Sequence, residues 1–176
     1  MPGSARENDA DLLAYIGDNH TRTILDVGAG SGTYQRIIGR RVTHIDAIEA
    51  WQPYVEHYAL TERYRHVTVT DIRHLATAGV TYGIRYDLVI FGDILEHMSR
   101  DDALDVWTWA HAIACAGLIS LPMRHWAQGP EHGNHFEAHH DDHLTGTDLL
   151  DPASPFGPFD HVWAYELTGT FIKAFS

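Results

Sequence analysis

Three glycines at alternate positions could leave room for a ligand at the turn between a strand and a helix. Gly28, Gly30 and Gly32 directly follow the mostly apolar run 24–27. Glycine lacks the Cβ atom that would stand between the backbone and a bound molecule. The free N–H groups and positive dipole end of the next helix favour a carboxylate or a phosphate. The segment is therefore predicted to bind a small ligand through its backbone.

The glycine spacing and a later acid narrow the type of ligand. A dinucleotide fingerprint reads G-x-G-x-x-G, whereas the position of its last glycine is Thr33 in this chain. Glu49 is expected to end the second strand, where its carboxylate can accept hydrogen bonds from both hydroxyls of a ribose. An acid at that place is common to both kinds of nucleotide site. The spacing therefore makes a nicotinamide-dependent oxidoreductase the weaker alternative.

These motifs resemble those of the class I S-adenosylmethionine-dependent methyltransferases, small-molecule branch. The resemblance runs in register from residue 20 to about residue 121. Its four motifs are Asp26-Val-Gly-Ala-Gly-Ser-Gly, the acid Glu49, Val69-Thr-Asp71-Ile72, and the segment 87–97 with its Leu-Glu-His ending. The resemblance implies an enzyme that binds S-adenosylmethionine and transfers its methyl group.

The resemblance also implies which residues form the cofactor site. They are Asp26, Gly28, Ala29, Gly30, Gly32, Tyr34, Glu49, Ala50, Asp71, Ile72, Gly92 and Asp93. Asp71 would pair with the adenine amino group, and it can cap a helix at the same time. Asp26 is expected to organise the turn by accepting hydrogen bonds from backbone N–H groups rather than to touch the ligand.

Candidate catalytic residues follow the fourth and fifth strands. A sulfonium methyl is already activated, so the enzyme mainly aligns the reactants, and a base working near pH 7 helps the acceptor lose its proton. Ligands of doubly wound sheets bind beyond the carboxyl ends of the strands. His97, Glu137 and His139 are predicted there, with His97 alternatively a hydrogen-bonded histidine that stabilises the turn. Gly133-Asn134-x-x-Glu137-Ala-His139 resembles a string in some small phage-like and bacterial methyltransferases, which assigns these residues no role.

Six of the 14 histidines lie between His125 and His143. His135 and His139 are four residues apart and would converge on a metal ion if they lay on one helix. Gly133 and the nearby prolines disfavour a helix, so no metal ligand is predicted. A polar rim of the substrate site is the favoured interpretation, and metal binding by residues 131–143 is left open.

Alternating apolar runs and amphipathic segments predict the elements that position these residues. Strands are expected over 23–27, 42–48, 66–69, 86–91 and 117–121, with a C-terminal antiparallel pair over 160–167 and 170–175 separated by Gly169. Helices are expected over 8–18, 31–39, 52–62, 71–78 and 101–115, with a short one within 141–150. The fold class is α/β, doubly wound, with a mostly parallel seven-stranded sheet and an antiparallel C-terminal hairpin. One domain, 1–176, would comprise a cofactor-binding core (8–121), a substrate-side loop region (122–158) and the hairpin (159–176).

The composition of the chain limits the classes of substrate and partner that are expected. The chain has 24 acidic and 12 basic residues, a net charge of −12, whereas nucleic-acid binders usually present a basic face. Gly92-Asp93-Ile94-Leu95 stands where amino-methylating nucleic-acid enzymes carry Asn/Asp-Pro-Pro-Tyr. A small-molecule substrate is predicted, with no nucleic acid and no membrane partner. An enzyme acting on a macromolecule and a non-catalytic module that binds S-adenosylmethionine are the alternatives.

Other features are expected from single residue types. Cys115, the only cysteine, is expected to be a buried packing thiol. A cytoplasmic location is expected, because the sequence shows neither a disulfide framework nor a signal-peptide core. Aromatic residues that could form a wall of the substrate site are Trp126, Phe136, Trp163 and Tyr165. The oligomeric state is left open, with a homodimer as one option.

Overall fold

The computed structural model describes residues 7–125 and 127–175, which form one seven-stranded sheet in the order β3-β2-β1-β4-β5-β7-β6. The strands are β1 (Thr23–Val27), β2 (His44–Glu49), β3 (Val67–Val69), β4 (Leu88–Gly92), β5 (Ala116–Pro122), β6 (His161–Ala164) and β7 (Thr168–Ala174). The first five are parallel, and β7 runs antiparallel to both β5 and β6. The predicted fold class is confirmed.

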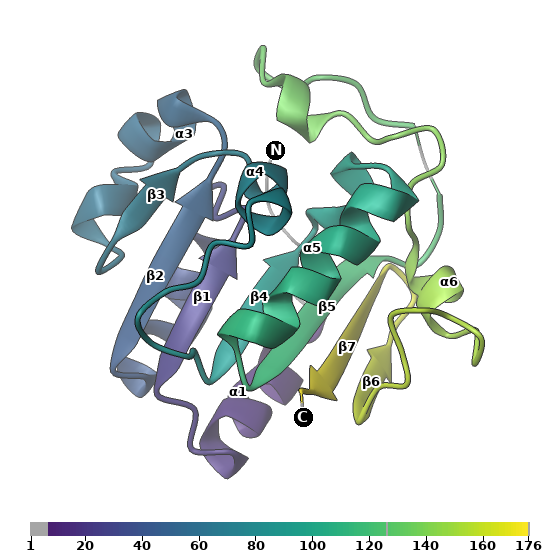
Figure 1. Cartoon of the computed structure of the whole chain (residues 1–176), viewed down its shortest axis with the longest axis horizontal. Helices are drawn as coiled ribbons and strands as arrows, with labels where there is room; N and C mark the ends of the chain where they lie inside the picture. The colour runs from purple at the N-terminus through teal and green to yellow at the C-terminus, as the bar shows by residue number, and fades with distance from the viewer. Residues whose placement is uncertain (1–6, 126, 176) are drawn as a thin grey trace.

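Helices cover both faces of the sheet (Figure 1). They are α1 (Asp9–Asp18), α2 (Thr33–Ile38), α3 (Gln52–His57), α4 (Ile72–Thr77), α5 (Arg100–Ile113) and α6 (Gly146–Leu149), with 3-10 turns η1 (Gly39–Arg41), η2 (Leu60–Glu62), η3 (Leu95–His97) and η4 (His135–Glu137). Helices α4 and α5 pack on one face, and α1, α2 and α3 pack on the other. Because both faces are covered, the central strands are apolar on both sides.

Alternate residues of the central strands enter two separate cores. In β4, Val89 and Phe91 belong to the core beneath α4 and α5, whereas Leu88 and Ile90 belong to the core beneath α1 to α3. All four side chains are fully buried. This two-sided burial fixes the register of the strands and hence the position of the loops at their carboxyl ends.

Two predicted boundaries are wrong for local reasons. The helix expected over 52–62 ends at His57, because Ala59 adopts a left-handed conformation (φ 49°) before η2. Gly169 does not separate the last two strands but lies inside β7, opposite Leu121 and Ala164. A Cβ atom on Gly169 would lie 2.7 Å from atoms of Met123 and Phe171, so close packing rather than a turn accounts for this glycine.

The segment between β5 and β6 lies over the carboxyl ends of the parallel strands, as the green ribbon of Figure 1 shows. It contains η4 and the short helix α6, which starts with a reciprocal capping box between Thr145 and Asp148. The backbone N–H of His140 donates to the carbonyl oxygen of Glu96 at 3.1 Å. This hydrogen bond holds the segment against η3, next to the end of β4.

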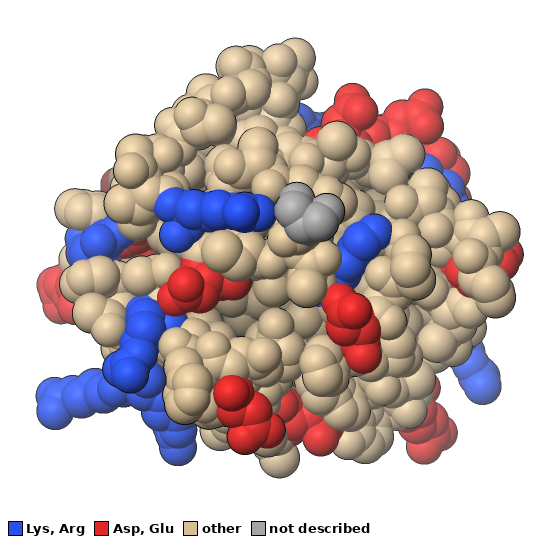
Figure 2. All heavy atoms as spheres, turned by 60° about the horizontal axis from the view of Figure 1, so that its bottom comes forward, with Lys and Arg blue, Asp and Glu red and all other residues tan. Residues whose placement is uncertain are grey.

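The surface carries charges of both signs. Figure 2 shows basic side chains gathered at the lower left of one face and standing singly elsewhere, among acidic and neutral ones. Cys115 is exposed, so the prediction of a buried thiol is wrong. The residue follows α5, and its backbone, not its side chain, is held by Tyr86 and Phe175. No helix in the described part of the chain is both long and apolar enough to cross a bilayer.

Candidate functional site

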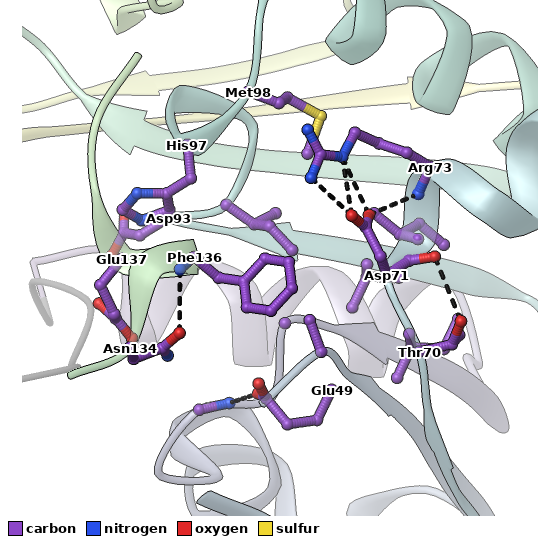
Figure 3. Close-up of a pocket in the computed structure, with 17 residues that line it drawn as sticks. Glu49, Thr70, Asp71, Arg73, Asp93, His97, Met98, Asn134, Phe136 and Glu137 are labelled. Atoms are coloured by element: carbon purple, nitrogen blue, oxygen red, sulfur yellow. Dashed lines mark hydrogen bonds and ion pairs between the residues drawn. The ribbon is translucent and has the colours of Figure 1, made fainter. Parts of the chain in front are cut away.

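An open cavity lies at the carboxyl ends of β1, β2, β3 and β4 (Figure 3). The predicted cofactor residues that line it are Gly28, Gly30, Glu49, Ala50, Asp71, Ile72 and Asp93. Two of the predicted catalytic residues, His97 and Glu137, line the same cavity. Residues far apart in the sequence meet here because parallel strands place all their carboxyl ends at one edge.

Two glycines of the turn, Gly28 and Gly32, each allow a different side chain to approach the backbone closely. Gly28 and Gly32 both have φ of 73°, a conformation that side chains disfavour. A Cβ atom on Gly28 would lie 2.5 Å from Cδ1 of Ile94, beside the cavity. A Cβ atom on Gly32 would lie 2.5 Å from a guanidinium nitrogen of Arg63. The first glycine therefore keeps the cavity open, and the second admits an arginine.

Arg63 stabilises the glycine turn from the side away from the cavity, and the sequence motifs did not reveal it. Its guanidinium donates to the carbonyl oxygen of Ser31 at 2.9 Å and to that of Gly32 at 2.8 Å. It also donates to Oε1 of Gln35 at 3.2 Å. A planar group with several donors is suited to hold three acceptors at once.

Arg63→Lys is expected to lower the free energy of unfolding by about 1–2 kcal/mol, because an ammonium group cannot reach all three acceptors of the turn. Chemical denaturation measures the effect. Arg40→Lys is the matched control, since Arg40 is exposed and should lose less than about 0.5 kcal/mol. Equal effects of the two changes would remove Arg63 from the support of the turn.

Glu49 lies at the bottom of the cavity and is only 5% exposed. Its Oε2 accepts a hydrogen bond from the backbone N–H of Gly30 and its Oε1 accepts one from that of Trp51, both at 2.8 Å. Burial raises the pKa of Glu49, and these two hydrogen bonds oppose the rise. Each carboxylate oxygen has a second lone pair, so the group can still accept hydrogen bonds from the hydroxyls of a ligand.

Asp26 does not organise the turn as predicted. The backbone N–H groups of Gly28 and Ala29 donate to the carbonyl oxygen of Ile48 instead. Oδ2 of Asp26 accepts from the hydroxyl of Tyr64 at 2.5 Å, and its buried Oδ1 has no hydrogen-bond partner among the described residues. Burial, reinforced by the charge of Glu49, raises the pKa of Asp26 to about 7. The residue therefore lies beneath the turn, and it is not among the residues that line the cavity.

Asp71 begins α4 and is already paired. It accepts from the backbone N–H of Arg73 at 2.9 Å, and both of its oxygens contact the Arg73 side chain at 2.5–3.0 Å. Burial would raise the pKa of Asp71, but the hydrogen bonds from Arg73 outweigh it and the pKa is lowered. Arg73 also lines the cavity, a role the sequence motifs did not indicate. A base recognised by Asp71 would share the carboxylate with this arginine.

The other predicted cofactor residues lie beside the cavity rather than on its wall. They are Ala29, Gly32, Tyr34 and Gly92. The ring of Tyr34 occupies the space that a Cβ atom on Gly92 would need. Tyr34 also lines a second, smaller cavity, which it shares with Ser120 and Thr170. Gly92 therefore lets an aromatic ring pack against the end of β4.

No protein-family model matches the chain, and no curated protein matches it. Many solved structures are similar in fold, and three of them are described below. The magnesium protoporphyrin IX methyltransferase of Synechocystis PCC 6803 with bound SAH has a TM-score of 0.68 at 12% identity, over 97% of this chain and 83% of that one. The chain has the class I methyltransferase fold. An O-methyltransferase family protein from Burkholderia thailandensis gives 0.66 at 14% identity, over 97% and 56% of the two chains.

A third structure is an S-adenosylmethionine-dependent methyltransferase from Clostridium acetobutylicum. Its TM-score is 0.54 at 12% identity, over 65% of this chain and 49% of that chain. The present chain thus spans about half the length of the Clostridium and Burkholderia proteins. At such identities the comparison establishes the class I methyltransferase fold alone.

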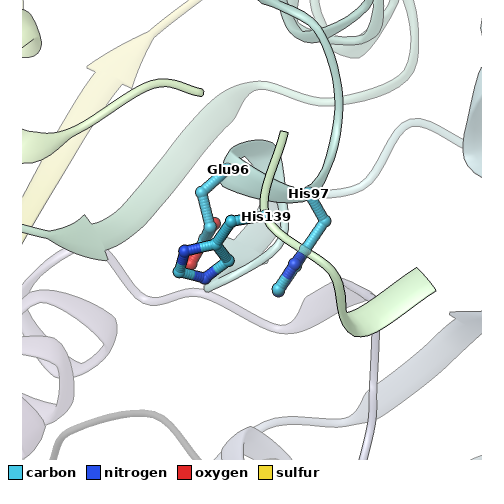
Figure 4. A group of neighbouring side chains, drawn as sticks. All are labelled: Glu96, His97 and His139. Carbon is cyan, nitrogen blue, oxygen red and sulfur yellow. The ribbon is translucent and has the colours of Figure 1, made fainter. Parts of the chain in front are cut away.

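In this class I methyltransferase fold, the predicted catalytic residue His139 lies next to His97. The ring centroids of His139 and His97 are 4.9 Å apart. Burial and the neighbouring His139 lower the pKa of His97 to about 4. Glu96 lies next to both histidines (Figure 4) and is 1% exposed. Burial and the charge of Asp93 raise the pKa of Glu96 well above its usual range. Glu96 belongs to the Leu-Glu-His ending but was not predicted as a site residue.

The turn η4 forms the outer wall of the cavity. Asn134 is buried and caps this turn, its Oδ1 accepting from the backbone N–H of Phe136 at 3.0 Å. Phe136, Asn134 and Glu137 all line the cavity. Burial and the charge of Glu49 raise the pKa of Glu137. Glu137 and Glu49 thus belong to one electrostatic environment.

The aromatic wall and the histidine pair of the loop differ from expectation. Of the four aromatic candidates, Phe136 lines the cavity, while Trp163 packs on the core beneath α1 and Tyr165 donates to Asp11. Trp126 lies outside the described residues. The backbone between His135 and His139 is not α-helical, because η4 ends at Glu137 and Ala138 is extended. The two histidines therefore lack the helical spacing that would have brought them together.

Proposed function

We propose that the chain is an S-adenosylmethionine-dependent methyltransferase that transfers the methyl group to an oxygen or nitrogen atom of a small metabolite. The observation that carries the proposal is Glu49, a buried carboxylate with unused lone pairs, at the bottom of a cavity beside a glycine turn. The class I methyltransferase fold supports the same cofactor. A nicotinamide dinucleotide is disfavoured by Thr33, where its fingerprint requires glycine.

The cavity residues fit the parts of this cofactor. Glu49 would accept the ribose hydroxyls, Asp71 and the backbone of Ile72 would meet the adenine, and the glycine turn with Asp93 would face the amino-acid part. When bound, the cofactor supplies a methyl group activated by its sulfonium. The protein then mainly has to hold the acceptor in line, which is an effect of orientation.

The acceptor side is proposed to consist of His97, Glu137 and His139. Imidazole and carboxylate groups can take the proton that a hydroxyl or amine loses. Phe136 adds an apolar surface to the same side of the cavity. The segment 122–158 would then be the substrate-side part of a single domain, between the cofactor-binding core 8–121 and the hairpin 159–176.

A small molecule is the substrate class that the surface favours. The net charge of −12 and the mixture of basic, acidic and neutral side chains on the face in Figure 2 offer little to a phosphate backbone. Of the proteins with a similar fold, the magnesium protoporphyrin IX methyltransferase has a small molecule in its name, and the Burkholderia protein belongs to an O-methyltransferase family. A single cysteine is consistent with a reducing compartment, and we propose the cytoplasm.

Glu49→Ala tests the proposal, and we expect it to weaken binding of S-adenosylhomocysteine by about 10–100-fold. The reason is the loss of charge-assisted hydrogen bonds, worth about 1.5–3 kcal/mol. Isothermal titration calorimetry gives the affinity, and thermal unfolding of the free protein shows whether the glycine turn survives. Glu62→Ala is the matched control, because Glu62 is exposed. Unchanged affinity in a folded Glu49→Ala would exclude Glu49 from the site.

A further inference from the structure

Three side chains with metal-binding atoms converge beside the cavity (Figure 4). Glu96 and His97 come from η3, and His139 comes from the segment that covers it. One ligand atom from each lies within 4.8 Å of the other two. Ligands of a tetrahedral zinc ion, at about 2.0–2.2 Å from the metal, are roughly 3.3–3.6 Å apart. A small movement of flexible side chains would therefore close the group around an ion.

The group also contains buried polar atoms that the rest of the protein does not satisfy. Oε2 of Glu96 and Nδ1 of His97 are buried without a hydrogen-bond partner within the described ranges. Leaving such an atom unpaired costs about 1–3 kcal/mol, and more for a charged group. A cation between the three side chains would satisfy both atoms at once.

The surroundings of His97 and His139 fit metal ligation. Backbone groups of Ala138 and Asp93 lie close enough to the His97 imidazole to oppose the lowering of its pKa, while Nδ1 of His97 has no partner among the described residues. A backbone contact of this kind fixes the tautomer of a ligating histidine, because the other nitrogen then keeps its lone pair. The hydrogen bond from His140 N to the Glu96 carbonyl oxygen joins the two segments that carry the ligands. The three side chains are therefore held together before any ion binds.

A further imidazole lies beside this group. The ring centroid of His143 is 4.8 Å from that of His139. Nδ1 of His143 lies 2.7 Å from the carbonyl oxygen of His140, which can only accept, so Nδ1 carries the hydrogen. Nε2 is then left with a lone pair, and it is buried without a partner among the residues described.

We propose that Glu96, His97 and His139 bind one divalent transition-metal ion of the zinc type. Two imidazoles and one carboxylate suit Zn²⁺, Co²⁺ or Fe²⁺, whereas Mg²⁺ prefers oxygen ligands. Three protein ligands leave at least one coordination position open, as in catalytic zinc sites. His97 also lines the cavity, so the open position would hold an oxygen atom of the methyl acceptor. With both imidazoles bound to the ion, Glu137 would be the group that takes the acceptor's proton. Only these last two steps depend on the proposed methyltransferase function.

The test uses the full chain, freed of metal with a chelator. Zn²⁺ titration by calorimetry is expected to give one equivalent bound with a micromolar or lower dissociation constant. Co²⁺ is expected to give visible absorption bands that one equivalent of Zn²⁺ abolishes. Both His139→Ala and the isosteric Glu96→Gln should weaken Zn²⁺ binding by about 100-fold. Loss of a group that only orients a ligand already lowers metal affinity by about 10–100-fold, and loss of a ligand itself should cost at least as much. Circular dichroism confirms that each variant is folded.

His140→Ala is the matched control. His140 lies in the same loop, is exposed and pairs with Asp142, so its loss should leave Zn²⁺ binding unchanged. Equal weak binding of several Zn²⁺ ions by all four proteins would overturn the proposal, since it indicates surface histidines alone. Binding of Mg²⁺ but not of Zn²⁺ or Co²⁺ would overturn the assignment of the metal.

The same samples separate this inference from the proposed function. S-adenosylhomocysteine is titrated into each protein with and without Zn²⁺. Binding of S-adenosylhomocysteine without a specific Zn²⁺ site would overturn the metal proposal alone. A specific Zn²⁺ site in a chain that does not bind S-adenosylhomocysteine supports the metal proposal and contradicts the methyltransferase function.

Discussion

Gly28→Ala is expected to weaken S-adenosylhomocysteine binding by roughly 100-fold, or about 2.7 kcal/mol. The new Cβ atom would lie 2.5 Å from Cδ1 and 3.3 Å from Cβ of Ile94. Rotating the Ile94 side chain relieves the first contact but not the second. Either the turn moves or Ile94 is displaced into the cavity, and both changes remove space from the ligand. Calorimetric titration of the two proteins measures the loss.

Gly79→Ala is the control for backbone strain. Gly79 also has a positive φ, of 60°, but nothing lies within 4 Å of a Cβ atom placed on it. Both variants should lose about 1–2 kcal/mol of stability from the left-handed backbone, whereas only Gly28→Ala should lose affinity. If the two variants bind S-adenosylhomocysteine equally well, the glycine turn does not border the cofactor.

His139→Ala is expected to lower the rate of methyl transfer by about 10²–10⁴-fold, the range for removing a group that assists proton loss. Affinity for S-adenosylhomocysteine should change less than about twofold, because His139 is not among the residues that line the cavity. The measurement is the rate of S-adenosylhomocysteine formation with an acceptor that the wild-type chain methylates, alongside calorimetry.

His140→Ala serves as the neighbouring control, since its exposed ring points to Asp142. It should keep the wild-type rate. Full activity of His139→Ala would end its role on the acceptor side. A loss of affinity equal to the loss of rate would instead assign His139 to the cofactor site.

The fold was predictable because its signals are local. The apolar runs and the glycine turn mark each βα unit, and parallel strands leave few alternative arrangements. The strand register then brings Gly28, Glu49 and Asp71 to one edge without any further information. For this reason seven of the twelve residues that the family resemblance assigned to the cofactor site line one cavity.

The supporting contacts were not predictable because they join distant segments through single side chains. Arg63 meets the turn at Ser31 and Gly32 from η2, where an exposed arginine would look the same in sequence. The hydroxyl of Tyr64 likewise donates to Asp26 from a distant segment, and Asp26 therefore pairs with Tyr64 instead of with the turn. No residue spacing indicates such contacts, since they depend on side-chain geometry across the fold.

The contacts of the histidine cluster were also not predictable from residue spacing. Spacing drew attention to His135 and His139, because a helix would bring them together, but the backbone there is not helical. The partner of His139 is instead the Glu96–His97 pair, about 40 residues earlier in the chain. Only the packing of segment 122–158 against η3 brings these groups together.

Isothermal titration with S-adenosylmethionine, S-adenosylhomocysteine and NAD tests the proposed cofactor most directly. Our account predicts micromolar binding of both adenosyl ligands, one per chain, and no binding of NAD. Absence of binding of either adenosyl ligand to a folded sample would contradict the account and leave a class I methyltransferase fold without its cofactor.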